Sequence, residues 1–181
     1  MATGNYYIIN GLRHARVSYV ISELAVNIDR AVPTNNACNL GTLMHLDIER
    51  YLCGESDRQF ELKAQFLRFM DTHIHPAWKL RASEELVFNA DARIAGTVDA
   101  LFVNKITGRL MIIDWKRTRC LYAESMVQYQ LQLNLYRHII GIDIVDIIGL
   151  VILHPDNNDF HFVEVPVIDV AFYIDNAIHL I

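Results

Sequence analysis

Long hydrophobic runs are missing from this chain of 181 residues. No apolar stretch approaches the roughly 18 residues that a transmembrane helix needs, so no membrane-spanning segment is expected. The first ten residues lack the basic start and the apolar stretch of a signal peptide. These two absences predict a soluble, intracellular protein without a membrane partner, in a compartment that the sequence leaves open.

Cysteine is also scarce, with three residues at Cys38, Cys53 and Cys120. An odd number without paired spacing argues against a disulfide framework. It equally argues against a four-cysteine zinc or iron–sulfur site supplied by this chain, so no iron–sulfur cluster is expected. Cys38 and Cys53 are interpreted as buried or incidental thiols.

Positive charge is in deficit, because 16 Lys and Arg face 21 Asp and Glu and leave a net charge of −5. Phosphate binding is mostly electrostatic, so this balance counts against tight non-specific coating of DNA. Acidic residues that bind a metal ion would be neutralised by it, which would reduce the conflict between the negative net charge and a nucleic-acid partner. With 52% hydrophobic and 20% charged residues and no repeat or linker, the chain is expected to form a single globular domain over 1–181.

The periodicity of apolar residues divides the chain near Glu84 into a helical part, about 1–80, and a sheet-forming part, about 81–181. Helices are expected at 17–32, 43–52 and 60–78, the last shortened by Pro76. Strands are expected at 84–88, 92–103, 110–115, 145–154 and 160–165, and further helices at 122–140 and 167–181. This order predicts an α/β (α+β) fold with a central mixed sheet flanked by helices.

The segments that carry chemistry are Gly96-Thr97-Val98-Asp99 and Ile112-Ile113-Asp114-Trp115-Lys116. Two neighbouring antiparallel strands are expected to end in Asp99 and Asp114, with Lys116 on the same side as Asp114. The Trp115 side chain would point away while its backbone carbonyl faces the site. Two carboxylates and a carbonyl suit Mg²⁺ or Mn²⁺, and a lysine can orient water or neutralise developing charge. Asp114 and Lys116 alone would equally fit a surface ion pair.

Together these segments resemble the motifs of the PD-(D/E)XK nuclease superfamily. Gln132 and Tyr136 match the Gln-x-x-x-Tyr signature of its RecB-like branch. Gly41, His45 and Glu49 resemble the Gly-x-x-x-His-x-x-x-Glu helix of that branch. The resemblance covers about 41–136 and looks closest to nucleases of large DNA viruses and mitochondrial genome maintenance exonucleases. It implies a restriction-endonuclease-like core.

The resemblance also implies metal ligands at His45, Asp99, Asp114 and the carbonyl of Trp115, holding one or two Mg²⁺ or Mn²⁺ ions. Lys116 would be the catalytic lysine. His45 alone would more readily be a hydrogen-bonded core histidine, and the match around it favours the ligand.

Glu84 would bind a second metal or hold the catalytic lysine, and it fits equally well as an exposed acid at the start of a strand. Gln132 and Tyr136 would position the lysine, water or a DNA phosphate, the alternative being a polar edge of an amphipathic helix. Candidate nucleic-acid contacts are Lys105, Arg117, Arg119, Gln128 and Arg137. Each arginine taken singly would also fit as a solvated surface charge.

The function implied is a metal-dependent deoxyribonuclease that hydrolyses phosphodiester bonds. Such a protein would act as an exonuclease on single-stranded DNA or duplex ends in repair, recombination or replication. Two alternatives remain. One is a catalytically silent nuclease-fold protein that binds nucleic acid or a protein partner, and the other is a metal enzyme acting on small phosphoesters.

Overall fold

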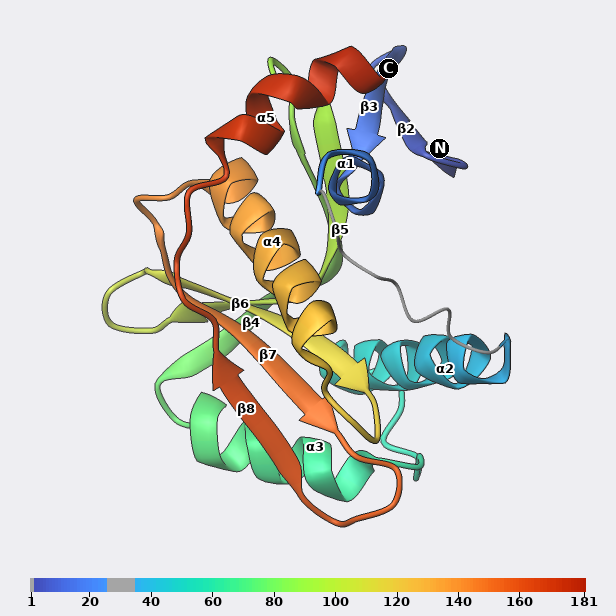
Figure 1. The fold of residues 1–181 in the computed structure, drawn as a ribbon. Helices are drawn as coiled ribbons and strands as arrows, with labels where there is room; N and C mark the ends of the chain where they lie inside the picture. Colours follow the sequence, from blue (N-terminus) through green and yellow to red (C-terminus); the bar gives the residue numbers. More distant parts are fainter. Residues whose placement is uncertain (1, 26–34) are drawn as a thin grey trace.

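The computed structural model describes residues 2–25 and 35–181, in which all strands join one mixed eight-stranded sheet (Figure 1). The strand order is β1-β2-β3-β5-β6-β7-β8, and β4 pairs with β5 outside this path. The strands are β1 (Ala2–Thr3), β2 (Tyr6–Ile9), β3 (Leu12–Arg16), β4 (Trp78–Asn89), β5 (Ile94–Asn104), β6 (Leu110–Arg117), β7 (Val145–Leu153) and β8 (Phe160–Glu164).

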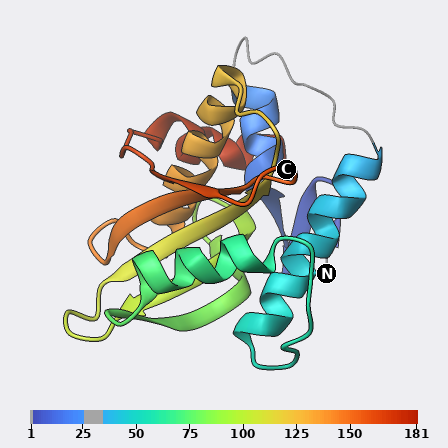
Figure 2. The same ribbon diagram turned by 90° about the horizontal axis from the view of Figure 1, so that it is seen from below.

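Helices cover both faces of this sheet (Figures 1 and 2). The helices are α1 (Val17–Leu24), α2 (Asn35–Leu52), α3 (Lys63–Phe69), α4 (Ala123–Ile140) and α5 (Ala171–Ala177), with a π-helical turn at Met70–Ile74 and a 3₁₀ turn at Ile178–Leu180. Helices α1, α4 and α5 pack on one face, and α2 and α3 pack on the other. The expected mixed sheet flanked by helices is confirmed. None of the described helices has the length and apolar character needed to cross a bilayer.

Two hydrophobic clusters form the core, one on each face of the sheet. Strand β6 contributes side chains to both clusters. Leu110 and Ile112 pack with α4, while Met111, Ile113 and Trp115 pack with α3. This alternation is the two-residue period of an extended strand. A strand buried on both faces therefore reads as a continuous apolar run, as β6 does.

The N-terminal residues differ from the expected helical part, because residues 2–16 form three strands. Tyr6–Ile9 contains aromatic and β-branched residues, which favour strands. Asn10 and Gly11 follow with φ of 52° and 76°, the conformation of a tight hairpin turn. The Asn-Gly pair was therefore an available sequence signal that the helical interpretation missed.

The first three helices also differ in extent from the predicted ranges. Helix α1 occupies Val17–Leu24, and 26–34 lie outside the described residues. Helix α2 begins at Asn35 rather than 43. The third helix gives way to a π-helical turn that ends at Ile74, and Trp78 already begins β4 by pairing with Asn104. Pairing with β5 along 12 residues of β4 outweighs the helical spacing of side chains there.

The end of the chain is less helical than 167–181 predicted, since α5 spans only Ala171–Ala177 before the 3₁₀ turn. All three cysteines are exposed, so Cys38 and Cys53 are incidental rather than buried thiols.

Candidate active site

The candidate site lies where β5 loses one of its neighbours. Strand β6 pairs with β5 only between Ala100 and Val103, and β3 pairs with it only at Ile94 and Ala95. Within the described chain, 96–99 therefore have β4 on one side and an open edge on the other. Asp99 fills this gap, because its Oδ2 accepts a hydrogen bond of 2.9 Å from the Trp115 backbone N–H. The two acids were expected at strand ends, but Asp99 lies inside β5 and Asp114 inside β6.

His45 reaches this gap from α2. Its Nε2 lies 2.9 Å from the carbonyl oxygen of Trp115, a geometry in which the ring nitrogen donates. Its Nδ1 lies 3.5 Å from Asp99 Oδ2 and 3.6 Å from Glu84 Oε1. One ligand atom from each of His45, Glu84 and Asp99 fits within 4.8 Å of the others. This grouping has the donor types and the spacing of a divalent-metal site.

The charges of this grouping attract a cation. Burial lowers the pKa of His45, but hydrogen bonds to Asp99 and Glu84 outweigh this effect and raise the pKa to about 10. Burial raises the pKa of Asp99, and His45 and Lys116 more than offset this, so the carboxyl stays ionised. A proton on His45 therefore neutralises carboxylates that a metal ion would neutralise instead.

Lys116, which is half-buried, forms a second pair with the buried Asp114, with 2.7 Å between Nζ and Oδ2. Burial raises the pKa of Asp114, and the positive charge of Lys116 only partly offsets it. Burial lowers the pKa of Lys116, but the charges of Asp114 and Asp99 raise it more, so the ammonium stays charged. The ammonium lies 5.0 Å from the ring centre of Tyr129, a cation–π contact.

Helix α4 holds Asp114 from the other side. Gln132 Nε2 lies 3.2 Å from Asp114 Oδ1 and 3.4 Å from the hydroxyl of Tyr136. Burial, followed by the charges of Asp114 and Asp99, raises the pKa of Tyr136, so its phenol is neutral. The Tyr136 ring packs on Gly96, where an added Cβ would lie 2.5 Å from Tyr136 Cε1. Gly96 therefore makes room for Tyr136.

The two acids come from opposite faces of the sheet. Asp114 follows Leu110 and Ile112 in the two-residue alternation and faces α4, whereas Asp99 meets His45 of α2. The open edge between β5 and β6 brings them close enough for Asp99 to shift the pKa of Asp114.

The candidate nucleic-acid contacts are mostly occupied by other residues. Arg117 donates two hydrogen bonds, of 3.2 and 2.8 Å, to the carboxylate of Glu61. Arg119 forms a close ion pair with Asp156. Gln128 is half-buried on α4. The structure therefore places neither arginine as a free phosphate contact.

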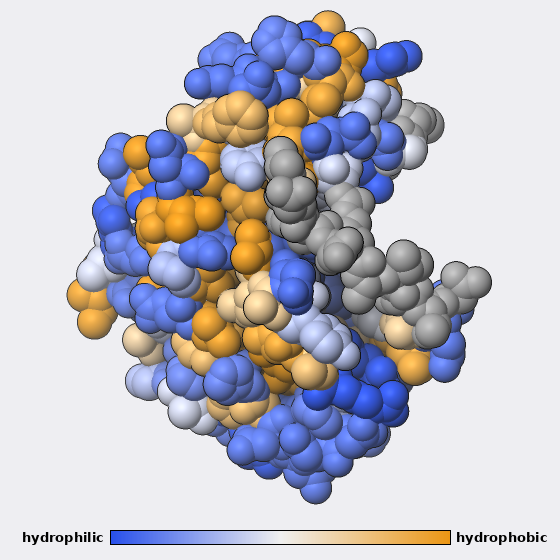
Figure 3. Space-filling view, in the orientation of Figure 1, coloured by the Kyte–Doolittle hydropathy of each residue, from blue (hydrophilic) through white to orange (hydrophobic). Residues whose placement is uncertain are grey.

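An open cleft of about 830 Å³ lies over the site. Its lining residues include His45, Glu84, Lys116 and Tyr129, together with a side of α2 that carries Glu49. Tyr129 was not among the residues expected at the site, although Tyr129, Gln132 and Tyr136 have the three- and four-residue spacing of one helix face. In the space-filling view the surface is hollowed between the region of α1 and β3 and the region of α2 (Figure 3).

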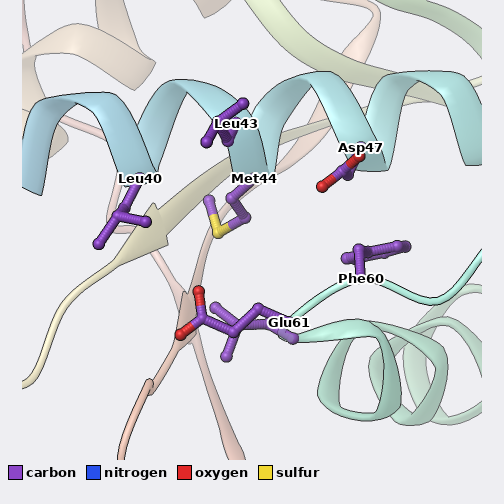
Figure 4. Close-up of a pocket in the computed structure, with 7 residues that line it drawn as sticks. Leu40, Leu43, Met44, Asp47, Phe60 and Glu61 are labelled. Atoms are coloured by element: carbon purple, nitrogen blue, oxygen red, sulfur yellow. The ribbon is translucent and has the colours of Figure 1, made fainter.

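A second cavity, of about 200 Å³, lies between α2 and the start of α3 (Figure 4). It is lined by Leu40, Leu43, Met44, Asp47, Phe60, Glu61 and Leu62. Its two acids are engaged, since Asp47 pairs with Arg58 and Glu61 with Arg117. This cavity therefore lacks a free group for chemistry.

Comparisons with known proteins agree with this site. Residues 55–143 match the sequence model of the PD-(D/E)XK nuclease superfamily, a range that includes Asp99, Asp114 and Lys116 but not His45. Among solved structures, one described as "Crystal structure of SSO0001" is 18% identical, covers 95% of this chain and 78% of its own, and has a TM-score of 0.49. No curated protein gives a significant match. The chain thus carries a domain of the PD-(D/E)XK nuclease superfamily, whose members are typically metal-dependent nucleases.

Proposed function

We propose that this protein is a deoxyribonuclease of the RecB-like branch that hydrolyses phosphodiester bonds with Mg²⁺ or Mn²⁺. The observation that carries the proposal is the meeting of two groups at the open edge of β5. One group is His45, Glu84 and Asp99, and the other is Asp114 with Lys116. Metal ligands and a lysine ammonium in one cleft are what in-line hydrolysis of a phosphodiester requires.

The donor set fits a hard divalent cation with one nitrogen ligand. His45 would bind through Nδ1, because its Nε2 is turned to the Trp115 carbonyl. Asp99 and Glu84 would supply oxygens, and Asp114 would complete the site. A bound cation would polarise the phosphate and lower the pKa of water. The Trp115 carbonyl, expected as a ligand, would instead orient His45.

The remaining residues act on charge and position. Lys116 presents a half-buried ammonium that would stabilise negative charge developing on the phosphate. Gln132 holds Asp114 in one orientation through its amide. The neutral phenol of Tyr136 lies beside Gln132 and keeps it turned to the carboxylate.

We further propose an exonuclease that acts on single-stranded DNA or duplex ends in repair, recombination or replication. The patterns Gly41–His45–Glu49 and Gln132–Tyr136 support this finer assignment, with viral and mitochondrial genome maintenance nucleases as the expected relatives. The test uses labelled linear and circular DNA, single-stranded and duplex, with Mg²⁺, Mn²⁺ or a chelator. Metal-dependent cutting of linear DNA, with circles left intact, is the expected result.

A variant pair makes this test specific. Lys116→Ala should abolish cutting and leave DNA binding largely intact, because the ammonium acts on the transition state. Lys79→Ala is the control, since Lys79 is exposed near the start of β4. Cutting by Lys116→Ala at the wild-type rate would contradict the proposal.

The net charge of −5 and the pairing of Arg117 and Arg119 with acids favour one alternative, a nuclease-fold protein that binds without cutting. That protein would bind the same DNA and leave it intact with every metal. A small-phosphoester enzyme would instead cleave bis(4-nitrophenyl) phosphate and leave DNA intact.

A further inference from the structure

The sheet face that carries Asp99 continues beyond the site toward the N-terminal strands. In β5, Ala95, Thr97 and Asp99 lie at two-residue steps and therefore share one face. Asp99 meets His45 on this face, so it is the side of the sheet on which α2 lies. We call the part beyond Asp99 the N-terminal sheet face, with Tyr7, Arg16, Leu86, Phe88 and Thr97 as its members.

Strand register places these side chains together. Ala95 pairs with Arg16 of β3 and with Phe88 of β4, and Thr97 pairs with Leu86. Residues directly opposite in neighbouring strands point to the same face. Tyr7 joins them through its hydroxyl, which lies 3.1 Å from Thr97 Oγ1.

This face is open and apolar in part. Leu86 is 44% exposed and Phe88 is 42% exposed, although both lie in a strand of the central sheet. The Phe88 ring meets His14 edge-on, which fixes the ring while one side remains accessible. Helices α1, α4 and α5 pack on the opposite face and cannot cover it.

Arg16 supplies the charge on this face. Its guanidinium lies 4.9 Å from the centre of the Tyr7 ring, which holds it in place. Its Nε is buried and has no hydrogen-bond partner among the described residues. Arg117 and Arg119, by contrast, are each paired with a carboxylate. A guanidinium that is held in place and forms no ion pair with an acid of the described residues is suited to an anion from outside the chain.

We propose that the N-terminal sheet face binds single-stranded DNA and leads it to the catalytic cleft. Bases would stack on Phe88 beside Leu86, and Arg16 would bind a backbone phosphate, the combination that single-strand binding proteins use. Four residue-to-residue steps along β5 lead from Ala95 to Asp99, a distance of roughly 13 Å. That length holds no more than about four stacked nucleotides at about 3.4 Å each. The inference rests on the proposed nuclease function and names its substrate as an unpaired strand.

The test is fluorescence anisotropy with a labelled oligothymidine strand in Ca²⁺, with the probe checked for integrity. Phe88→Ala and Arg16→Gln should each weaken binding roughly 5- to 100-fold. Phe88→Leu keeps an apolar contact with His14 and loses the aromatic ring, so it should weaken binding if Phe88→Ala misfolds. A blunt duplex of equal length should bind the Phe88 variants within about twofold of wild type, since its bases are not accessible for stacking.

Two matched controls lie on the opposite face. Arg13 stacks on Tyr6 in the same hairpin, with 5.6 Å between guanidinium and ring centre. Phe172 on α5 is 59% exposed. Arg13→Gln and Phe172→Ala should leave binding unchanged. Equal effects from the controls, or wild-type binding by both Phe88→Leu and Arg16→Gln, would overturn the inference.

Cutting assays separate this inference from the proposed function. If wild-type protein cuts DNA while the Phe88 and Arg16 variants bind and cut normally, the proposed DNA-binding role of the N-terminal sheet face is wrong and the proposed nuclease function is supported. If the variants lose DNA binding but no metal supports cutting by the wild type, the proposed binding role of the face is supported and the proposed nuclease function is wrong.

Discussion

The orientation of His45 determines which of its atoms can bind a metal. Donation from Nε2 to the Trp115 carbonyl leaves Nδ1 directed at Asp99 and Glu84. A backbone carbonyl thus selects the tautomer, as outer partners of metal-binding histidines commonly do.

Metal affinity should rise with pH. The pKa of His45 is raised to about 10 in the metal-free protein, and a metal ligand must be deprotonated. Binding therefore releases a proton, and affinity for Mn²⁺ should increase by up to about tenfold per pH unit between pH 6 and 8. Calorimetry in two buffers of different ionisation enthalpy measures the proton release. An affinity for Mn²⁺ that does not change with pH would contradict this prediction. His45→Gln should make the affinity less dependent on pH.

The stability of the metal-free fold should change with pH in the opposite direction to the metal affinity. A pKa raised in the folded state means that the proton on His45 stabilises the metal-free fold. This contribution is fully present below the ordinary pKa of about 6.5 and is lost as pH rises through about 10.

Gly96 offers a test at the scale of one methyl group. In Gly96→Ala the new Cβ would meet the Tyr136 ring at 2.5 Å, so the ring and Gln132 must shift. We expect a loss of about 1–3 kcal/mol in the free energy of unfolding and slower cutting. Gly41→Ala is the stability control, because its Cβ would have open space within a helix. Equal free energies of unfolding for Gly96→Ala and wild type, measured by urea denaturation, would contradict the packing argument.

Among the elements, α4 carries both core residues and residues of the candidate site. Leu131 and Leu135 are buried in the core, while Gln132 faces Asp114. Gln132→Ala should slow cutting by about 10- to 1000-fold, the loss typical of one positioned donor where charge develops.

The control for this prediction is Gln130→Ala, because Gln130 contacts the Pro166 carbonyl on another side of α4. Both variants should unfold within about 1 kcal/mol of wild type. A Gln132→Ala protein that cuts at the wild-type rate would remove Gln132 from the catalytic group.

At the scale of the whole molecule, the acidic charge limits how DNA can be held. With a net charge of −5, and with Arg117 of the cleft and the nearby Arg119 both paired with acids, the protein offers few free cations to phosphates. We expect two to three phosphate contacts for a single strand, hence a slope of about −1.5 to −2 for log affinity against log salt concentration. Binding titrations from low to physiological salt measure this slope. A slope steeper than about −4 would indicate an extensive basic surface instead.

Much of the fold was predictable because the sheet strands have strong local patterns. The apolar runs of β6 and β7 and the helix α4 lie within a few residues of their predicted ranges. The strands β1 to β3 were missed because their hairpin is short and only partly buried, so its apolar periodicity is weak. The extent of β4 depended on its pairing with β5, a contact between segments that local spacing does not report.

The candidate site divides in the same way. The alternating directions of Asp114, Trp115 and Lys116 followed from the amino-acid order alone, because side chains in a strand alternate by covalent geometry. Only the tertiary structure decided that Asp99 and Asp114 approach from opposite faces, that Glu84 joins His45, and that Arg117 is occupied by Glu61. Those outcomes depend on where β5 and β6 diverge and how α2 packs, which are properties of long-range pairing.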